Sequence, residues 1–371
     1  MLVKRIINDV EFEVNVKKSR SIICSKDISN IIHGDLNEFI EYIYQRKKVY
    51  IPLAMTLEIT NKCNFNCQFC YINEDGKKKY DIEINKLKSD IDFLVNKGLL
   101  VVYLTGGEVL TYPHFEELYR YLKYKGIFVV LLTNLSLLNE KHIKLFKELP
   151  PYRITVSIYG MTEEQFQNVT QTQYDYKKIL KNIMLLKDNG ILVTCQTPLN
   201  KLTVSDFELI KHWCEEKHIR YSHSTELSDT YSGKSLKQLK IDDDIFNEEK
   251  IEKKILKSKI NFGYKYHFDC RAGKHTFAIS YEYKLRPCFM FFGEDAKTFD
   301  ANNSMESALN EMTQYINEMR RKKVAGCKGC IAHNICTECV FSQQKVKNLD
   351  EYMNEKCEMT YKKLLDLKII D

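Results

Sequence analysis

Short apolar runs rich in β-branched residues alternate with longer amphipathic segments between about residues 51 and 225. This alternation is typical of βα units that build a parallel sheet. Several runs are apolar at nearly every position, as strands covered on both faces require. The pattern therefore predicts six strands, at residues 53–60, 99–105, 127–133, 153–158, 191–197 and 219–224.

Helices are predicted between these strands, the first at residues 81–97. Two capping boxes mark helix starts, one from Thr162 to Gln165 and one from Ser205 to Glu208. Glycines at positions 98, 126 and 190 fall between a helix and the next strand, where a left-handed cap is expected. Six units are fewer than the eight of a closed barrel, so the pattern allows an open partial barrel or a doubly wound sheet.

Other segments flank this α/β core. Residues 1–50 contain strand-like stretches at 6–16 and 21–24 and a helix-like stretch at 36–46. Residues 226–265 are polar and read as a linker with a helix at 246–259. A helix with an apolar packing face is expected at 304–323.

Composition describes an ordinary core-forming chain of 371 residues, 44% hydrophobic and 29% charged. No apolar run approaches the roughly 20 residues of a membrane span, and no signal-peptide core is present, so we expect a cytoplasmic protein without a membrane partner. Lys and Arg total 56 against 50 acids, a net charge of +6 that is scattered along the chain. Nothing in this distribution indicates a nucleic-acid partner.

The 13 cysteines change the picture, because many reduced thiols in one cytoplasmic chain usually indicate metal or redox chemistry. Cys63, Cys67 and Cys70 follow the first predicted strand, at the ligand-binding end of the sheet. An ordinary [4Fe-4S] cluster takes four cysteines, and a structural zinc site also needs a fourth ligand. A cluster with three protein ligands leaves one iron open to another molecule.

The spacing Cys-x3-Cys-x2-Cys, with Phe69 before the last cysteine, resembles the signature of radical S-adenosylmethionine (SAM) enzymes, and the alternative is a fortuitous zinc or disulfide trio. The resemblance implies that the open iron chelates the amino and carboxylate groups of SAM. It also implies that the Gly-Gly-Glu motif after the second strand holds the SAM ammonium, and that polar residues after the third and fourth strands line its ribose and methionine moieties. The implied cofactor-binding residues are Phe69, Gly106, Gly107, Glu108, Asn134 and Ser157.

Three positions depart from the family pattern. Val109 replaces a usual proline and Leu135 a customary glycine. Residues 169–175 lack the arginine that many relatives use on the SAM carboxylate. Lys201 and Arg153 are the alternatives for that role.

Seven more cysteines follow residue 269. The quartet with spacing Cys-x2-Cys-x5-Cys-x2-Cys taken alone favours a zinc ribbon, whereas the whole set resembles the SPASM extension, which holds two auxiliary [4Fe-4S] clusters. The resemblance implies that Cys270, Cys288 and Cys339 bind the nearer cluster and that Cys327, Cys330, Cys336 and Cys357 bind the distal one. The last spacing of the quartet is shorter than usual, and Tyr283 stands where a glycine is common.

The nearer cluster has only three predicted ligands, so one iron is open. A substrate thiolate suits that position because soft sulfur ligands suit iron-sulfur centres. His267, His275, water or a further cysteine are the alternatives.

With this resemblance, we expect a partial (β/α)6 TIM-like barrel followed by a small cysteine-rich iron-sulfur domain. The predicted division is an N-terminal module at 1–50 that binds peptide, a radical SAM core at 51–225, a linker at 226–265 and a SPASM-like domain at 266–371.

The predicted function is an oxidoreductase that matures a ribosomally made precursor peptide through a 5′-deoxyadenosyl radical, with a thioether crosslink as the sharper prediction. A flavodoxin- or ferredoxin-like protein is the expected electron donor. Epimerisation or a carbon-carbon crosslink would use the same residues. An anaerobic sulfatase-maturing enzyme is the second possibility, although Phe289 stands where those relatives carry an aspartate. A non-catalytic iron-sulfur redox sensor is the third.

Overall fold

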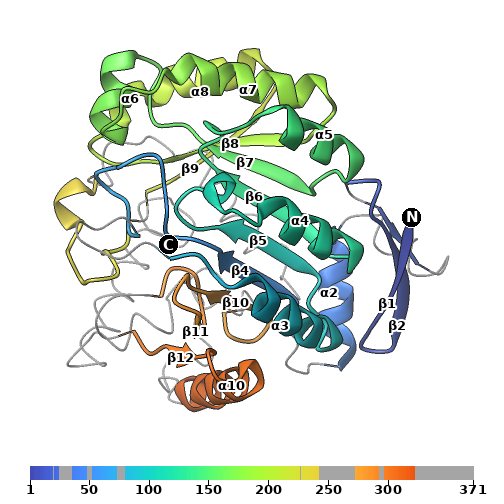
Figure 1. Ribbon diagram of the computed structural model, residues 1–371. Helices are drawn as coiled ribbons and strands as arrows, with labels where there is room; N and C mark the ends of the chain where they lie inside the picture. Colours follow the sequence, from blue (N-terminus) through green and yellow to red (C-terminus); the bar gives the residue numbers. More distant parts are fainter. Residues whose placement is uncertain are drawn as a thin grey trace, which may run out of the picture.

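The computed structural model describes residues 1–19, 21–24, 36–47, 52–72, 80–225, 227–241, 272–291 and 296–321 (Figure 1). Its centre is a nine-stranded sheet with the order β12-β11-β10-β4-β5-β6-β7-β8-β9. All six predicted strands are present as parallel neighbours in chain order, which confirms the partial (β/α)6 barrel. They are β4 (Ala54–Glu58), β5 (Val101–Thr105), β6 (Phe128–Thr133), β7 (Arg153–Ser157), β8 (Val193–Pro198) and β9 (Arg220–Ser224).

Helices connect the parallel strands, so the carboxyl ends of the strands meet at one edge of the sheet (Figure 1). Gly98, Gly126 and Gly190 have φ values of 110°, 72° and 75°, and each lies between a helix and the following strand as predicted. The helices are α3 (Ile84–Asn96), α4 (Phe115–Tyr124), α5 (Glu140–Glu148), α6 (Glu163–Thr170), α7 (Tyr176–Asp188) and α8 (Phe207–Glu216), with short 3-10 turns η1 (Val109–Thr111), η2 (Val204–Asp206) and η3 (Lys237–Leu239).

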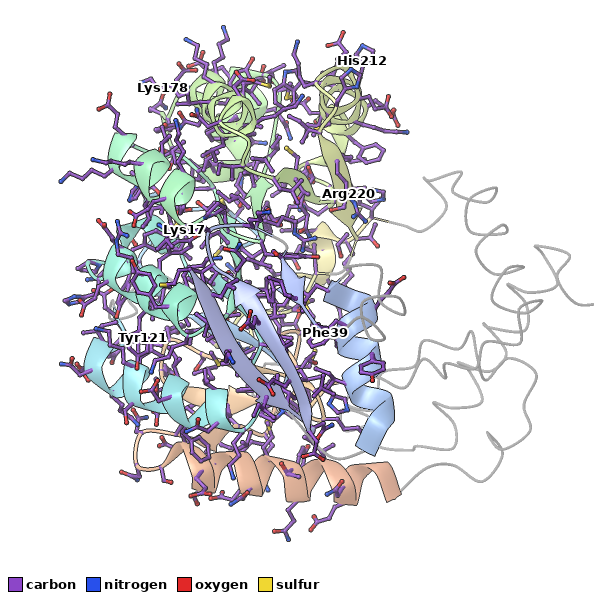
Figure 2. All side chains as sticks on the ribbon, turned by 90° about the vertical axis from the view of Figure 1, so that its right-hand side faces the viewer. Lys17, Phe39, Tyr121, Lys178, His212 and Arg220 are labelled. Carbon is purple, nitrogen blue, oxygen red and sulfur yellow. The ribbon has the colours of Figure 1, made fainter. Side chains whose placement is uncertain are left out.

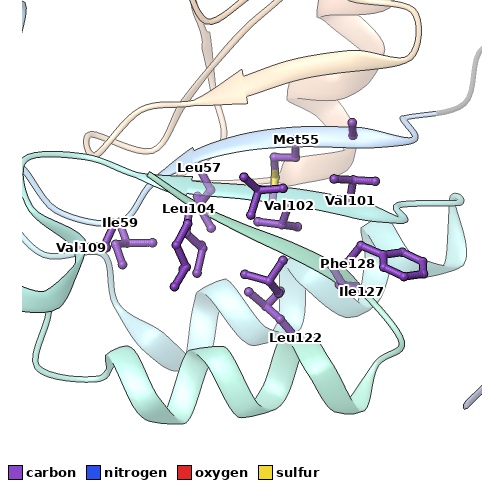
Figure 3. Packing of buried hydrophobic residues seen from close by; sticks show 14 of the residues in the cluster. Met55, Leu57, Ile59, Val101, Val102, Leu104, Val109, Leu122, Ile127 and Phe128 are labelled. Carbon is purple, nitrogen blue, oxygen red and sulfur yellow. The ribbon is translucent and has the colours of Figure 1, made fainter. Parts of the chain in front are cut away.

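The main core lies between the first strands of the sheet and helices α3 and α4 (Figure 3). Burying each aliphatic side chain stabilises the fold by about 1.5–3 kcal/mol relative to leaving it exposed. Neighbouring strands contribute alternate positions, because successive side chains of a strand point to opposite faces. The buried residues drawn there include Met55, Leu57, Ile59, Val102, Leu104 and Leu122.

The sheet continues beyond the six predicted strands. β10 (Thr276–Ile279) pairs in parallel with β4, on the side opposite β5, and β11 (Lys284–Arg286) and β12 (Phe299–Asp300) follow in antiparallel order. Helix α10 (Met305–Arg321) contacts β11 and β12. Its described apolar side chains on the packing face predicted at 304–323 are buried, namely Met305, Ala308, Leu309, Met312 and Ile316. These elements come from the segment predicted to form a separate cysteine-rich domain.

Most residues of that predicted domain's metal sites lie outside the described part of the chain. They are Cys270, Cys327, Cys330, Cys336, Cys339 and Cys357, together with the alternative ligand His267. The linker helix predicted at 246–259 also lies outside the described residues. Cys288 and His275 are described. The division into domains and the two auxiliary clusters therefore stay predictions.

The N-terminal residues form a second sheet of β1 (Leu2–Ile7), β2 (Val10–Asn15) and β3 (Ile22–Ile23), with α2 (Leu36–Lys47) packed beside it (Figure 2). The sequence pattern predicted one strand-like stretch at residues 6–16. A turn with positive φ at Asn8 and Asp9 interrupts it, so that β1 and β2 form a hairpin. Phe12 contacts Phe39 of α2 with ring centroids 4.7 Å apart.

Arg5 of β1 fixes this sheet to the core. Its guanidinium donates to the carbonyl oxygens of Leu99, at 2.7 Å, and Lys125, at 3.1 Å. These carbonyls follow the ends of α3 and α4, where helix carbonyls lack partners of their own. Burial lowers the pKa of Arg5 to about 10.

No helix within the described residues has the length and apolar character needed to cross a membrane.

Candidate functional site

A cavity of about 280 Å³ lies at the carboxyl ends of the parallel strands. Folds of this kind bind their ligands at that end, because the loops after the strands converge there. The cavity is lined by Cys63, Cys67 and Cys70 and by residues that follow β5 to β8. Five of the six predicted cofactor-binding residues are in its lining, namely Phe69, Gly106, Gly107, Asn134 and Ser157.

The first half of the cysteine loop rests on the Gly-Gly-Glu turn. The amide of Gly107 donates to the carbonyl of Thr60 at 2.8 Å, and the amide of Glu108 donates to that of Lys62 at 2.8 Å. A Cβ at Gly106 would lie 2.2 Å from the Thr60 oxygen, and one at Gly107 would lie 2.1 Å from the Lys62 oxygen. Both glycines are therefore required by the approach of two backbones, whatever they contribute to a ligand.

The second half of the loop rests on the end of α6. The amide of Asn66 donates to the carbonyl of Thr170 at 2.9 Å, and that of Gln68 donates to Val169 at 3.2 Å. The Phe69 ring is almost fully buried and contacts Tyr159 with centroids 5.6 Å apart. The three cysteines are thus held between two backbone anchors.

Glu108 is the predicted site residue that lies behind the cavity wall. Its carboxylate accepts hydrogen bonds from the Thr133 hydroxyl at 2.6 Å and from the amides of Asn134 at 2.7 Å and Leu110 at 3.1 Å. Burial raises the pKa of Glu108, and these hydrogen bonds oppose the rise. Glu108 holds the end of β6 against the turn, and a direct contact with a ligand ammonium stays a prediction.

Asn134 connects this turn to the cysteine loop. Its Nδ2 donates to Oδ1 of Asn64 at 3.1 Å and lies 3.9 Å from Sγ of Cys63. The next residue, Leu135, has φ 60° and a fully buried side chain. Position 135 thus has the left-handed backbone conformation that a glycine adopts easily. In a leucine this conformation is strained.

Burial dominates the electrostatics of the thiols. It raises the pKa of Cys63 to about 12 and that of Cys67 well above its ordinary value, and the neighbouring thiolates add to both shifts. Hydrogen bonds from the Phe65 amide and from Tyr159 partly oppose these shifts. A metal bound by these cysteines would favour the thiolate forms, and its binding would release the protons.

The donor set fits a cluster better than a single ion. Among the described residues, no three His, Cys, Asp or Glu side chains converge on one metal-ion position. The three thiols nevertheless line one cavity, and a cubane cluster binds its thiolates on separate irons. The residues therefore fit a [4Fe-4S] cluster, which Cys63, Cys67 and Cys70 would hold.

The lining also contains Tyr71, Phe289 and Met290. Their neighbour Cys288 is half-buried, and its Sγ accepts from the Met290 amide at 3.4 Å. Tyr283, predicted as a substitute for a common glycine, has φ 63° and donates through its hydroxyl to Asp90 at 2.6 Å.

His275, an alternative ligand for the nearer auxiliary cluster, is buried at the start of β10, and its carbonyl accepts from the Ala54 amide at 2.9 Å. A ligand role for either His275 or Cys288 stays a prediction.

The sequence did not single out several lining residues, among them Tyr71, Tyr159 and Gln196. Tyr71 directly follows Cys70, and Tyr159 lies two residues after Ser157. Their position next to predicted site residues could therefore have identified them from the sequence. Neither alternative for the SAM carboxylate is in the lining, since Arg153 begins β7 and Lys201 is exposed. The described lining contains no Lys, Arg, His, Asp or Glu.

The comparison with known families decides what this arrangement is. Residues 57–214, from β4 to α8, match the model of the radical SAM superfamily. These residues form a radical SAM domain. The match includes the cysteine loop, the Gly-Gly-Glu turn and the ends of β5 to β8, which together make up most of the cavity. The radical SAM family implies a [4Fe-4S] cluster and SAM as the cofactors of this domain.

Proteins with such a domain include relatives of different activities. The antilisterial bacteriocin subtilosin biosynthesis protein AlbA of Bacillus subtilis is 29% identical over 144 residues, which are 38% of this chain and 32% of AlbA. The AdoMet-dependent heme synthase of Methanosarcina barkeri is 28% identical over 165 residues, 43% of this chain and 47% of that enzyme. The alignments thus span less than half of either relative.

A solved structure resembles the chain over a wider range. Streptococcus suis SuiB bound to precursor peptide SuiA has a TM-score of 0.64 and 13% identity, over 94% of this chain and 96% of SuiB. At this identity the likeness shows the fold.

Proposed function

We propose that the protein is a radical SAM maturase of a ribosomally made precursor peptide, and that it forms a thioether crosslink. The observation that carries the proposal is that the three cysteines of one loop line the same cavity as the ends of β5 to β8. AlbA is a bacteriocin biosynthesis protein and SuiB has been solved bound to a precursor peptide, and both observations support a peptide substrate.

The cluster and SAM, when bound, supply the reductive cleavage of SAM and the radical that takes a hydrogen atom from substrate. Cys63, Cys67 and Cys70 would hold the cluster, and Asn134 and Ser157 would contact SAM from the ends of β6 and β7. The chain itself has to orient substrate and exclude water. Phe69, Tyr71 and Phe289 give the cavity aromatic walls that serve this purpose.

The lining also suggests what enters the cavity. Because its described residues carry no charge, an ionised side chain would lose its hydration without gaining a partner. We therefore expect the side chain that loses its hydrogen atom in the cavity to be uncharged. Gln196, Ser224 and Ser228, which also line the cavity, could donate or accept hydrogen bonds with a peptide backbone.

The remaining predictions belong to this proposal. Two auxiliary clusters, on the ligands predicted above, would accept an electron from the product radical or hold the substrate thiolate. A flavodoxin- or ferredoxin-like protein would deliver the electron, in the cytoplasm. The three-stranded N-terminal sheet would bind the peptide outside the cavity.

Anaerobically reconstituted protein tests the proposal when it is incubated with dithionite and SAM. Formation of 5′-deoxyadenosine, measured by liquid chromatography and mass spectrometry, is the expected result. A cluster-replete sample that forms none, beside an active radical SAM control, would exclude the enzyme and leave the redox-sensor alternative.

The crosslink needs a peptide as probe. A synthetic peptide encoded by a short cysteine-rich reading frame beside the gene is the first choice. Thioether formation removes two hydrogen atoms from the peptide and one free thiol, which alkylation and mass spectrometry detect together. Conversion of a sulfatase-derived peptide to formylglycine would instead establish the sulfatase-maturing alternative, although Phe289 lies against Tyr71 where those enzymes carry a base.

A further inference from the structure

A buried carboxylate joins three segments around the cavity. Glu58, at the end of β4, has no exposed surface. Its oxygens accept hydrogen bonds from the Tyr231 hydroxyl at 2.7 and 2.8 Å, from Arg286 Nη2 at 3.0 Å and from the Tyr71 hydroxyl at 3.3 Å. The amide of Tyr281 also points to it, at 3.4 Å. We call Glu58, Arg286, Tyr231 and Tyr71 the Glu58 cluster.

Each partner of Glu58 comes from a different part of the chain. Tyr71 directly follows Cys70 of the metal-binding loop, and Arg286 ends β11, two residues before Cys288. Tyr231 belongs to the segment 227–241, and its amide donates to the carbonyl of Tyr71 at 3.1 Å. Movement of any one of these segments therefore disturbs the other two.

The Glu58 cluster contacts the cavity through one pair of aromatic rings. Tyr71 and Phe289 both line the cavity, and their centroids lie 5.5 Å apart with the planes at 87°. The hydroxyl end of Tyr71 is held by Glu58, and its ring also contacts Tyr231 at 5.7 Å. The orientation of this aromatic wall thus depends on groups that lie behind it.

A stabilising role alone does not account for such an arrangement. Arg286 is 1% exposed and Glu58 0%, and the desolvation of a buried ion pair offsets most of its attraction. Apolar residues of similar volume often stabilise as well or better. What the pair adds is a fixed geometry, because the Glu58 carboxylate accepts hydrogen bonds from Arg286, Tyr231 and Tyr71. The Arg286 guanidinium, 4.9 Å from the centre of the Tyr231 ring, reinforces this geometry.

We propose that the Glu58–Arg286 ion pair, with Tyr231, is a positioning device that sets the Tyr71–Phe289 wall against the cysteine loop. This inference rests on the proposed function, because the wall would position the reacting part of the substrate relative to the iron-sulfur cluster and SAM. Arg286, Glu58 and Tyr231 are positioning residues. They act through Tyr71 and Phe289.

The test compares Arg286→Met with Arg5→Met. Both variants remove a buried guanidinium. Arg5, however, donates to the carbonyls of Leu99 and Lys125, which precede β5 and β6 and so lie at the end of the barrel away from the cavity. The measurements are the thermal unfolding temperature, the iron content, the electron paramagnetic resonance (EPR) spectrum of the reduced cluster with SAM, and the rate of 5′-deoxyadenosine formation.

We expect both variants to unfold at a lower temperature. Only Arg286→Met should change the EPR spectrum with SAM and slow 5′-deoxyadenosine formation, by roughly tenfold or more, because small misplacements in a reacting site have effects of that size. Arg286→Lys keeps the charge and should restore part of the rate. Tyr231→Phe keeps the ion pair and should give a smaller change of the same kind.

Two results would overturn the proposal. One is an unaltered EPR spectrum and rate in both Arg286→Met and Tyr231→Phe. The other is that Arg5→Met reproduces the losses of Arg286→Met. Where Arg286→Met does not fold, Tyr231→Phe decides by the same measurements. If the unaltered protein forms no 5′-deoxyadenosine, the proposed function fails, and the EPR comparison still decides the role of the Glu58 cluster.

Discussion

The side-chain nitrogen of Asn134 lies 3.9 Å from the sulfur of Cys63, while the backbone amide of Asn134 donates to Glu108 at 2.7 Å. One residue therefore ties the end of β6 to a predicted cluster ligand. Donors near the sulfurs of an iron-sulfur cluster favour its reduced, more negative state. We therefore expect the potential of a cluster held by Cys63 to depend on the Asn134 side chain.

Asn134→Leu removes the amide but leaves the backbone hydrogen bond in place. We expect the midpoint potential of the SAM-binding cluster to fall by roughly 20–60 mV, the equivalent of one ordinary hydrogen bond. A redox titration followed by EPR measures it. Asn182→Leu is the control, because Asn182 donates to the neighbouring Leu135 carbonyl at 3.0 Å without approaching a sulfur. An equal shift in both variants would contradict the assignment.

Replacement of Cys63 by alanine should abolish 5′-deoxyadenosine formation, because two thiolates do not hold the cluster with one free iron. The iron content should fall by one cluster per chain. Cys24→Ala is the matched control, since Cys24 lies in the N-terminal sheet region, half-buried and outside the cavity lining. Retained cleavage of SAM after Cys63→Ala would show that the loop is not the cluster site.

The sequence predicted well those parts of the molecule whose causes are local. Strands β4 to β8 follow from runs of apolar residues, and the cysteine loop follows from spacing within eight positions. Thr162 caps α6 as predicted, through a hydrogen bond to the Gln165 amide at 3.2 Å. Each of these signals is complete within one short window of the chain.

Features that depend on distant contacts were not predicted. Glu58 and Arg286 are 228 positions apart, and neither stands in a recognisable motif. The capping box at Ser205 was wrong, because α8 begins at Phe207 with no side-chain cap. The carboxylate of Asp206 instead accepts from the Met161 amide, at 2.6 Å, in another connection of the barrel. Partners of this kind are set by tertiary packing.

Gly107→Ala tests whether the Gly-Gly-Glu turn supports the cysteine loop. The added Cβ meets the Lys62 carbonyl at 2.1 Å, so the two backbones must separate. We expect loss of iron and of SAM cleavage together. Gly190→Ala is the control, because its Cβ meets nothing within 4 Å and its φ of 75° costs only about 1–2 kcal/mol of stability. Full iron loading in Gly107→Ala would exclude a supporting role for the turn.

Lys123 gives the fold a pH dependence of a definite sign. Its side chain is 1% exposed, and its Nζ donates to the Pro150 carbonyl at 2.8 Å. Burial lowers the pKa of Lys123 from 10.5 to about 8. Between these two values the unfolded chain binds more protons than the folded one, so stability rises with pH. Below about pH 8 the full penalty of a buried ammonium is present.

Lys123→Met should therefore stabilise the protein at pH 7, by about 2 kcal/mol once the lost hydrogen bond is subtracted from the effect of the pKa shift. The gain should shrink as the pH rises from 8 to 10.5, because the wild-type lysine becomes neutral there. Denaturant unfolding at several pH values measures the difference. Lys125→Met removes an exposed ion pair with Asp92 and a contact with the Tyr121 ring, and it should show no gain at pH 7. A gain in Lys123→Met that persists unchanged at pH 10.5 would mean that packing, not charge, is its cause.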